Sequence, residues 1–293
     1  MNWRAFAPAK VNLFLHVGPP QLDGYHPLCS LMVFADVGDT VAVQPAEQPE
    51  FVLDGPFAAS LLTEPHNLVQ RAADALLSRI PGPKPPFRLI LDKRLPIASG
   101  LGGGSSDAGA TLRLLREALE LEVADEALEA VAASLGADGA ACLWGKPVIA
   151  EAVGDHLTPA PRLPTLEAVL VNPRRPSPTA AVYKAFDAAG ARGTADRPGL
   201  PDEIETVEEL AAMLSYCRND LEVHAVALEP AIGEVLATLR GEPETLIARM
   251  SGSGASCFAL CAGDFEAESL AERVEQMRPA WWVRRCRLGA PEL

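Results

Sequence analysis

The sequence is short of positive charge. It holds 25 Lys and Arg against 39 Asp and Glu, which gives a formal net charge of −14 at pH 7. A body this acidic repels the phosphates of DNA and RNA, so nucleic acid is excluded as a general partner. A small anion can still bind where side chains or a helix N-terminus supply local positive potential. We therefore expect any anion site to be small and concave.

Long apolar runs are missing as well. No stretch approaches the roughly 20 apolar residues that a membrane-spanning helix needs, so no membrane association is expected. Residues 1–6 show no apolar run after a basic start, which predicts a cytoplasmic protein without a secretory signal. With 48% hydrophobic and 22% charged residues, the 293-residue chain has the composition of one large or two ordinary folded domains. A monomer and a homodimer both fit the sequence.

Several familiar chemical signatures are absent too. The six cysteines form no Cys-x-x-Cys pair and have no His cluster beside them, which argues against a zinc site. No Gly-x-Ser-x-Gly elbow supports a serine hydrolase. No cluster of Asp and Glu indicates a dedicated metal cage, so the ligands of any metal stay unknown at this point.

What the sequence does contain is an irregular mixture of strand and helix patterns, which favours an α+β fold over a doubly wound sheet. A stretch rich in Pro and Gly at 154–164 predicts a division into domains 1–155 and 156–293. Asp23-Gly24 predicts a turn, and 189–202 a mobile loop. Apolar periodicity predicts strands over 9–17, 37–43, 87–91, 140–143, 148–152, 166–171, 256–261 and 281–286. It predicts helices over 67–80, 125–135, 179–188, 207–214, 230–239 and 265–277, and one more that Ser106 or Asp107 caps.

The strongest local signal is the run Gly100–Ser106, here called the phosphate loop, which leads into that last helix. Glycine lets backbone N–H groups approach an anion closely, and the start of a helix adds unsatisfied donors. The loop is not a Walker loop, since Ser105 and not Lys follows Gly104, and its glycine spacing is not that of a Rossmann fold. A flexible linker is disfavoured because a strand and an amphipathic helix flank the run closely.

Residues 96–108 around this loop resemble the second motif of the GHMP kinases, the family of galactokinase, homoserine kinase and mevalonate kinase. Residues 7–13 resemble the first motif and residues 250–257 the third, in the order of that family. The resemblance implies a two-domain GHMP kinase fold. The N-terminal, ATP-binding domain of that fold is similar to ribosomal protein S5 domain 2, and its C-terminal domain is ferredoxin-like.

Narrower matches resemble one branch of the family, whose substrate is a methylerythritol that carries cytidine diphosphate. They are Lys10–Leu13, Asp23–His26, the triple glycine and Leu135–Asp138. This implies transfer of the ATP γ-phosphoryl group to the substrate's 2-hydroxyl, in isoprenoid precursor biosynthesis. Two places depart from the pattern. Ala98-Ser99 stands where many relatives carry glycines and is expected to stiffen the phosphate loop, and Gly139-Ala140 stands where relatives usually carry Val-Pro.

The resemblance implies two catalytic residues. Asp138 would accept the proton of the hydroxyl, and Lys10 would lie between Asp138 and the acceptor oxygen, keep Asp138 ionised and stabilise negative charge. ATP is the implied co-substrate, and Mg²⁺ is expected because it commonly bridges the β- and γ-phosphates. The implied ATP-binding residues are Asn67, Lys93, Pro96, Ser99, Gly100, Leu101, Gly102, Gly103, Gly104, Ser105 and Ser106, with Ser106 as the candidate metal contact.

The implied acceptor site contains Asn12, Tyr25, His26, Asp138 and Tyr183. Tyr25 and Tyr183 would stack on the cytosine, and His26 would hydrogen-bond its edge. The loop around Gly252–Gly254 would close on the phosphates from the second domain.

The residues alone leave simpler roles open for the same positions. These are a turn residue for Asp138, a solvated strand position for Lys10, a helix start for Asn67, a surface charge for Lys93, packing for Tyr25, His26 and Tyr183, and a hairpin turn for Gly252–Gly254. Two rival functions also stay open. One is a GHMP kinase that acts on homoserine, mevalonate or a sugar, and the other is a GHMP-fold protein that binds a ligand without catalysis.

Overall fold

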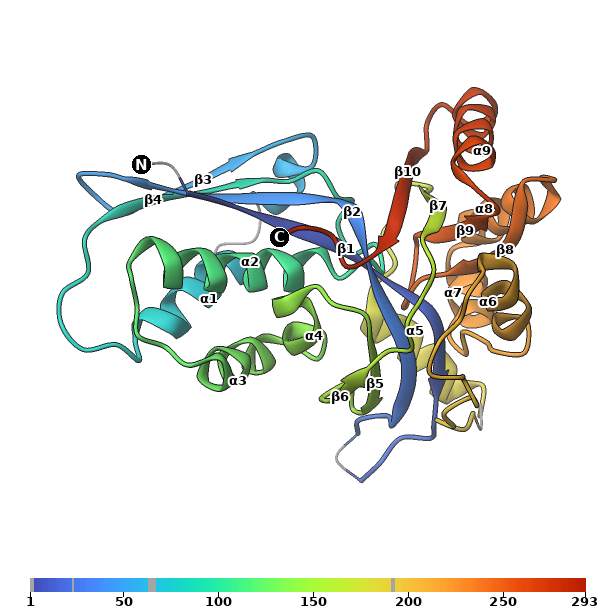
Figure 1. The fold of residues 1–293 in the computed structure, drawn as a ribbon, viewed down its shortest axis with the longest axis horizontal. Coiled ribbons are helices and arrows are strands. Elements are labelled where there is room, and N and C mark those ends of the chain that lie inside the picture. The colour runs from blue at the N-terminus through green and yellow to red at the C-terminus, as the bar shows by residue number, and fades with distance from the viewer. Residues whose placement is uncertain (1–2, 23, 63–66, 191–192) are drawn as a thin grey trace.

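One mixed sheet runs through the computed structural model, which describes residues 3–22, 24–62, 67–190 and 193–293 (Figure 1). Its central strand β2 (Leu28–Pro45) pairs antiparallel with β1 (Trp3–Val17) along one edge. Three strands pair with the other edge of β2. From the N-terminal to the C-terminal end of β2 they are β5 (Val148–Ala152), β10 (Trp282–Gly289) and β4 (Phe87–Asp92). β3 (Glu50–Asp54) adds to β4 in parallel, and β6 (His156–Pro159) pairs with β5.

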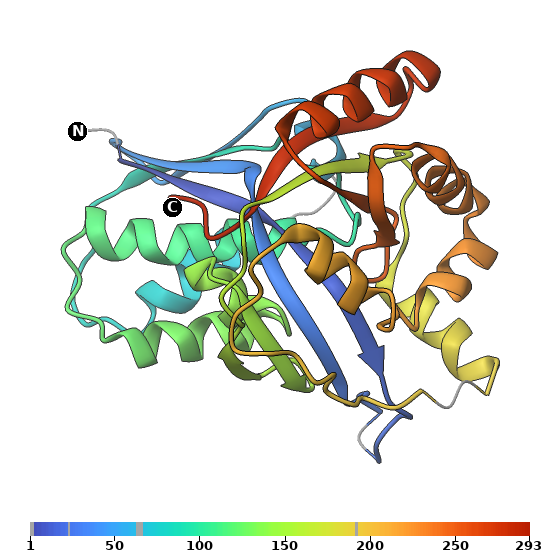
Figure 2. The same ribbon diagram turned by 45° about the vertical axis from the view of Figure 1, so that its right-hand side comes forward.

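The last strand joins the two halves of the chain. β10 pairs with β2 at Leu288 and Gly289, and along the rest of its length with β7 (Leu166–Asn172). β9 (Cys257–Cys261) and β8 (Thr245–Met250) then continue the sheet beyond β7. Strands from both ends of the sequence, β1 and β2 in blue and β10 in red, therefore come together where the two halves of the chain meet (Figure 2).

Four helices pack on the first half of the sheet: α1 (Leu68–Leu77), α2 (Gly103–Ala118), α3 (Asp125–Leu135) and α4 (Gly139–Trp144). They bury one apolar face each, as Val69, Ala72 and Leu76 show on α1. Their shared core includes Val41 and Leu91 of the sheet.

The second half carries α5 (Thr179–Ala188), α6 (Val207–Leu214), α7 (Glu222–Leu228), α8 (Pro230–Gly241) and α9 (Asp264–Met277). Every residue of β7 is buried, because helices cover both of its faces. Leu170 belongs to the core that includes α6, and Val169 to the core that includes α5, α7, α8 and α9. No helix among the described residues is both long and apolar enough to cross a membrane.

The predicted α+β content is confirmed, and so are most of the predicted elements, although β1 and β2 extend well beyond the predicted strands 9–17 and 37–43. Residues 140–143 are wrong as a strand, since they form α4; a four-residue apolar run carries no usable period. α2 begins at Gly103 with Gly102 as its N-cap, so neither Ser106 nor Asp107 caps it. The patterns missed β3, the short 3₁₀ helix at Ala58–Leu61, β6, α7 and β8.

Three further expectations meet the structure only in part. Asp23 of the expected turn lies outside the described residues. In the expected loop 189–202, residues 193–202 form no helix or strand, but Asp196 binds His16 through its carbonyl oxygen at 2.7 Å and Arg218 through its carboxylate at 3.0 Å. β6 lies just beyond the proposed domain boundary and pairs back onto β5 of the first half.

Candidate active site

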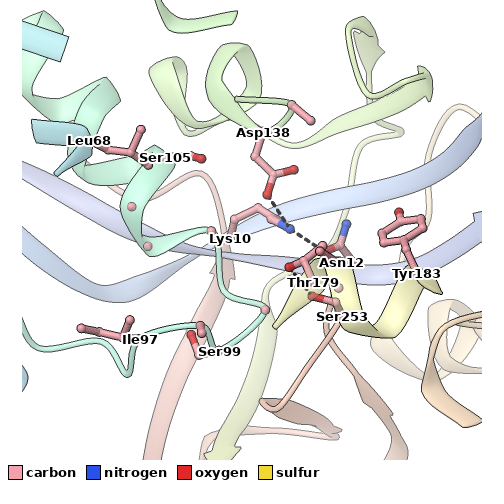
Figure 3. Close-up of a pocket in the computed structure, with 18 of the residues that line it drawn as sticks. Lys10, Asn12, Leu68, Ile97, Ser99, Ser105, Asp138, Thr179, Tyr183 and Ser253 are labelled. Carbon is pink, nitrogen blue, oxygen red and sulfur yellow. Dashed lines mark hydrogen bonds and ion pairs between the residues drawn. The ribbon is translucent and has the colours of Figure 1, made fainter. Parts of the chain in front are cut away.

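A cavity of about 1020 Å³ lies between the two halves of the chain. Its walls come from β1, the segment before β2, the start of α1, the phosphate loop, the start of α4, α5 and the loop at Gly252–Ser253 (Figure 3). Nearly all the predicted site residues line it. They are Lys10, Asn12, Tyr25, His26, Asn67, Lys93, Pro96, Ser99, Gly100, Gly102, Gly103, Gly104, Ser105, Asp138 and Tyr183.

Two predicted residues do not line the cavity. Leu101 is fully buried, and its carbonyl oxygen accepts a hydrogen bond of 2.8 Å from the backbone N–H of Lys10. Ser106, the fourth residue of α2, is fully buried as well and faces Cys142. Ser105, the residue before it, is the serine that faces the cavity (Figure 3).

The start of α2 offers open backbone donors. Gly102 is its N-cap with φ of 61°, a left-handed conformation that favours glycine, and no side chain caps the helix. The first N–H that bonds back into the helix is that of Ser106, to Gly102 at 2.9 Å. The N–H groups of Gly103, Gly104 and Ser105 are therefore available to an anion in the cavity.

The buried ammonium group of Lys93 packs against Gly103, the first residue of α2. Nζ of Lys93 lies 2.6 Å from Oδ2 of Asp39 and 2.7 Å from Oδ2 of Asp107, and it would be 3.0 Å from a Cβ on Gly103. Lys93 is 3% exposed, so it is not a surface charge. Burial opposes the charge on Lys93, but Asp107 and Asp39 outweigh burial and raise its pKa. Burial, with Asp39 adding to it, raises the pKa of Asp107 well above its usual value.

The glycine loop of the second half packs directly on the phosphate loop. Gly100 has φ of 75°, and a Cβ there would lie 2.2 Å from the carbonyl oxygen of Ser251. The hydroxyl of Ser251 donates to the carbonyl oxygen of Gly100 at 2.9 Å and accepts from the N–H of Asn12 at 3.1 Å. Ser253 lines the cavity and contacts Thr179 through their hydroxyls at 2.8 Å. The second domain thus fixes the position of the phosphate loop.

Lys10 and Asp138 meet at the centre of the cavity wall (Figure 3). Nζ of Lys10 is 3.1 Å from Oδ2 of Asp138 and donates to Oδ1 of Asn12 at 2.6 Å. The amide of Asn12 also donates to the hydroxyl of Ser30 at 2.7 Å, so both ends of that amide are occupied by protein groups. Asn12 therefore orients Lys10, whereas the Asp138 side chain is 30% exposed and reaches the cavity.

Local backbone explains why these groups converge. A β-bulge between Pro8 and Lys10 interrupts the pairing of β1 with β2. Asp138 is the N-cap residue of α4, and a Cβ on the next residue, Gly139, would lie 2.0 Å from the carbonyl oxygen of Ala132. Gly139 thus allows α4 to turn against α3 directly after Asp138.

A donor at the far end of the cavity is buried without a hydrogen-bond partner among the described residues. Oδ1 of Asn67 accepts from the N–H groups of Val69 and Gln70 and caps α1. Its Nδ2 is buried without a hydrogen bond to any described residue. An unsatisfied buried donor is costly, so Nδ2 is a natural partner for a ligand acceptor.

The opposite end of the cavity is aromatic. Tyr25 is 65% exposed, whereas His26 is buried beside Tyr183, with ring centroids 5.0 Å apart. Burial, with the Asp138 carboxylate adding to it, raises the pKa of Tyr183 to about 12, so its phenol stays protonated. Lys184 and Asp187 line the same end.

Sequence reasoning missed four of the charged residues: Asp39, Asp107, Lys184 and Asp187. For Asp39 a signal exists, because a carboxylate inside an apolar strand pattern needs a partner if it is buried. Among the described residues, no cluster of three His, Cys, Asp or Glu side chains is able to hold a metal by itself. Oxygen groups at the start of α2 that line the cavity are those of Ser105 and Asp107.

Comparison with known proteins gives consistent matches. Family models described as "GHMP kinases N terminal domain" and "GHMP kinases C terminal" match residues 67–146 and 202–279. A protein of Caulobacter sp. (strain K31) named 4-diphosphocytidyl-2-C-methyl-D-erythritol kinase is 65% identical over 99% of this chain and 100% of its own length. A crystal structure of 4-(cytidine 5'-diphospho)-2C-methyl-D-erythritol kinase has a TM-score of 0.76 at 33% identity and covers 99% of this chain and 100% of its own. Homoserine kinase from Cytophaga hutchinsonii shares the fold, with a TM-score of 0.70 at 18% identity over 99% of this chain and 95% of its own.

Proposed function

Because this chain belongs to the GHMP kinases, we propose that it phosphorylates 4-diphosphocytidyl-2-C-methyl-D-erythritol with ATP. The products are the 2-phosphate of that substrate and ADP, as a step in isoprenoid precursor synthesis. One observation carries the proposal: the Lys10–Asp138 pair, 3.1 Å apart, shares a single cavity with the open helix start of α2. A full-length relative at 65% identity bears the corresponding name.

Asp138 and Lys10 are proposed to activate the acceptor hydroxyl. The hydroxyl proton passes to the Asp138 carboxylate as the oxygen forms its bond to the γ-phosphorus, and the bond from that phosphorus to the leaving ADP oxygen breaks. Lys10 lies between Asp138 and Asn12, so its charge faces the carboxylate and is placed to stabilise the attacking oxygen. Phosphoryl transfer needs alignment and charge neutralisation more than a strong base, which this rigid arrangement supplies.

The phosphates of ATP are proposed to bind the N–H groups of Gly103, Gly104 and Ser105. The adenosine end then reaches Nδ2 of Asn67, which is buried without a hydrogen bond to any residue that the structure describes. Mg²⁺ is proposed as the metal. It usually keeps water and phosphate ligands and needs only one or two protein oxygens, which Ser105 and Asp107 offer. When bound, it neutralises charge on the β- and γ-phosphates.

The acceptor is proposed to bind at the aromatic end. Tyr25 and Tyr183 provide two flat faces for the cytosine. Lys184 lines this end and has no carboxylate partner among the described residues, so its charge is available to the diphosphate. The enzyme is proposed to be cytoplasmic and monomeric or homodimeric, and its net charge of −14 supports the absence of a nucleic-acid partner.

A coupled assay of ADP release tests the proposal. Purified protein with ATP and Mg²⁺ is offered the cytidyl-methylerythritol, homoserine, mevalonate and galactose in parallel. We expect turnover with the cytidyl substrate alone. Turnover with one of the others instead identifies a different GHMP kinase, and nucleotide binding without turnover on any acceptor identifies a binding protein.

A further inference from the structure

Asn219 is a buried amide whose three hydrogen bonds all go to backbone groups. Its Nδ2 donates to the carbonyl oxygens of Met250 and Gly252, each at 2.8 Å. Its Oδ1 accepts from the N–H of Leu221 at 3.0 Å. These contacts use two donors and one acceptor, which no other side chain of this size supplies from one planar group. Asn219 is 7% exposed and does not line the cavity, so it touches neither substrate subsite.

The two carbonyl groups that Asn219 binds lie on either side of Ser251. The hydroxyl of Ser251 donates to the carbonyl oxygen of Gly100 at 2.9 Å and accepts from the N–H of Asn12 at 3.1 Å. Gly252 has φ of 56°, and a Cβ there would lie 3.1 Å from that oxygen of Gly100 and 3.2 Å from Oδ1 of Asn12. By fixing the backbone before and after Ser251, Asn219 sets the position of the hydroxyl that joins the phosphate loop to β1.

The backbone around Asn219 is itself bonded to β1. The N–H of Leu15 donates to the carbonyl oxygen of Arg218 at 2.9 Å, and the N–H of Asp220 donates to the carbonyl oxygen of Leu15 at 3.0 Å. The carboxylate of Asp220 accepts from the N–H of Val17 at 2.7 Å. Asn219 is therefore fixed to the strand that carries the proposed catalytic lysine.

We propose that Asn219 is a positioning residue that aligns the phosphate loop with β1 and thereby places the γ-phosphoryl group of ATP in line with the acceptor. The proposal rests on the proposed function, since it takes the phosphate loop to bind ATP. Asn219 acts through the carbonyl groups beside Ser251, and Ser251 acts on Gly100 and Asn12. Phosphoryl transfer depends on alignment, and a displacement of about 1 Å is enough to cost about a hundredfold in rate.

Asn219→Asp tests this role, because aspartate keeps the shape and the acceptor for Leu221. An ionised carboxylate donates no hydrogen bond, and here it would face two carbonyl oxygens. We expect Kd for the β,γ-imido analogue of ATP, measured by calorimetry without acceptor, to rise about tenfold. We expect kcat to fall about tenfold or more and KM for the cytidyl substrate to stay unchanged. Asn219→Ala removes both donors without adding a charge, so it should give the same pattern, and it replaces the aspartate variant if that variant does not fold.

Asn172→Asp is the matched control at a second buried asparagine. Asn172 is 1% exposed, its Nδ2 donates to the hydroxyl of Ser256 at 2.9 Å, and its Oδ1 accepts from the N–H of Arg174 at 2.7 Å. The hydroxyl of Ser256 is able to rotate and donate to the new carboxylate, so no hydrogen bond is lost. We expect Kd and kcat to stay at the wild-type values. Losses equal to those of Asn219→Asp would show a general effect of a buried acid and would overturn the proposal.

A double variant tests whether Asn219 acts through Ser251. Ser251→Ala alone should also raise Kd for the ATP analogue and lower kcat. Because both changes interrupt one path, Ser251→Ala combined with Asn219→Asp should lose no more than the worse single variant. Losses that multiply, or an unchanged Kd in Asn219→Asp, overturn the proposal. A wild type that does not turn over the cytidyl substrate overturns the proposed substrate alone, since Kd is measured without acceptor and still decides the role of Asn219.

Discussion

Replacing Lys93 with methionine tests whether the buried charge cluster maintains the start of α2. Methionine keeps the length of the aliphatic chain and removes the ammonium group. The change removes the hydrogen bond of 2.6 Å to Asp39 and the hydrogen bond of 2.7 Å to Asp107, and it leaves both carboxylates buried. Removing one partner of a buried ion pair costs about 3–5 kcal/mol, because an uncompensated charge stays buried.

The two carboxylates differ in the hydrogen bonds that they keep after the substitution, and this difference narrows the expected loss in the free energy of unfolding. Oδ1 of Asp39 also accepts from the N–H groups of Arg94 and Leu95, so Asp39 keeps partners for its charge. Oδ1 of Asp107 has no hydrogen bond from a described residue, so Asp107 is the group left without support. We therefore expect a loss near the lower end, about 3 kcal/mol, out of the roughly 5–15 kcal/mol typical of folded proteins.

The loss should depend on pH in a defined direction. Asp107 already has a raised pKa in the folded wild type, and without Lys93 it should be raised further. A carboxyl group that binds its proton more tightly in the folded state makes stability fall as pH rises above its unfolded value. The deficit of Lys93→Met relative to the wild type should therefore be larger at about pH 8 than at about pH 5.

Urea unfolding at these two pH values measures both effects, with Lys146→Met as the control at an exposed lysine. KM for ATP should rise in Lys93→Met, since Gly103 loses its support. The double variant Lys93→Met with Asp107→Leu should recover part of the stability. A deficit below about 1 kcal/mol, typical of a surface ion pair, or one that is equal at both pH values, would refute the reasoning.

The remaining predictions concern catalysis, specificity and strain. Asp138→Asn should abolish turnover while the affinity for ATP survives, and unchanged turnover would remove Asp138 from the mechanism. Combined replacement of Tyr25 and Tyr183 by alanine should raise KM for the cytidyl substrate at least tenfold, since stacking on one base contributes about 1–3 kcal/mol. KM for ATP should stay unchanged. An equal rise in KM for both substrates would count against the assignment. Ala98→Gly should stabilise the protein by about 0.5–1 kcal/mol in thermal unfolding, because φ of 49° strains an alanine. The control Ala133→Gly on α3 should destabilise the protein. A similar loss of stability in both variants would contradict this interpretation.

The sequence was sufficient wherever chemistry depends on a short stretch of backbone. The phosphate loop could be predicted because glycines followed by an amphipathic helix fix a local geometry whatever surrounds them. The pairing of Lys10 with Asp138 could be predicted only from the family resemblance, since the sequence around either residue does not indicate that the two side chains lie close together. The helix at Gly139–Trp144 was missed because its single turn and a half is too short to show a period.

Partnerships between distant residues could not be predicted. Lys93 contacts Asp39, which lies 54 positions earlier in the chain, and His26 contacts Asp187 on a helix of the other half. Taken alone, Lys93 and Asp187 look like ordinary surface charges. Only the burial of Lys93 and the folding of the chain around His26 turn them into paired groups, and burial of a polar residue depends on the whole fold.

The cavity of this acidic protein lacks the excess of basic side chains that an anion site usually shows. Among the described residues its lining holds three lysines, Lys10, Lys93 and Lys184, against three aspartates, and aspartates pair with Lys10 and Lys93. The positive potential for two phosphorylated substrates must therefore come chiefly from the backbone N–H groups of α2 and from Lys184. Helix-end donors act only over about one turn, so they hold a small anion that enters the cavity and do not attract a nucleic acid to the acidic surface.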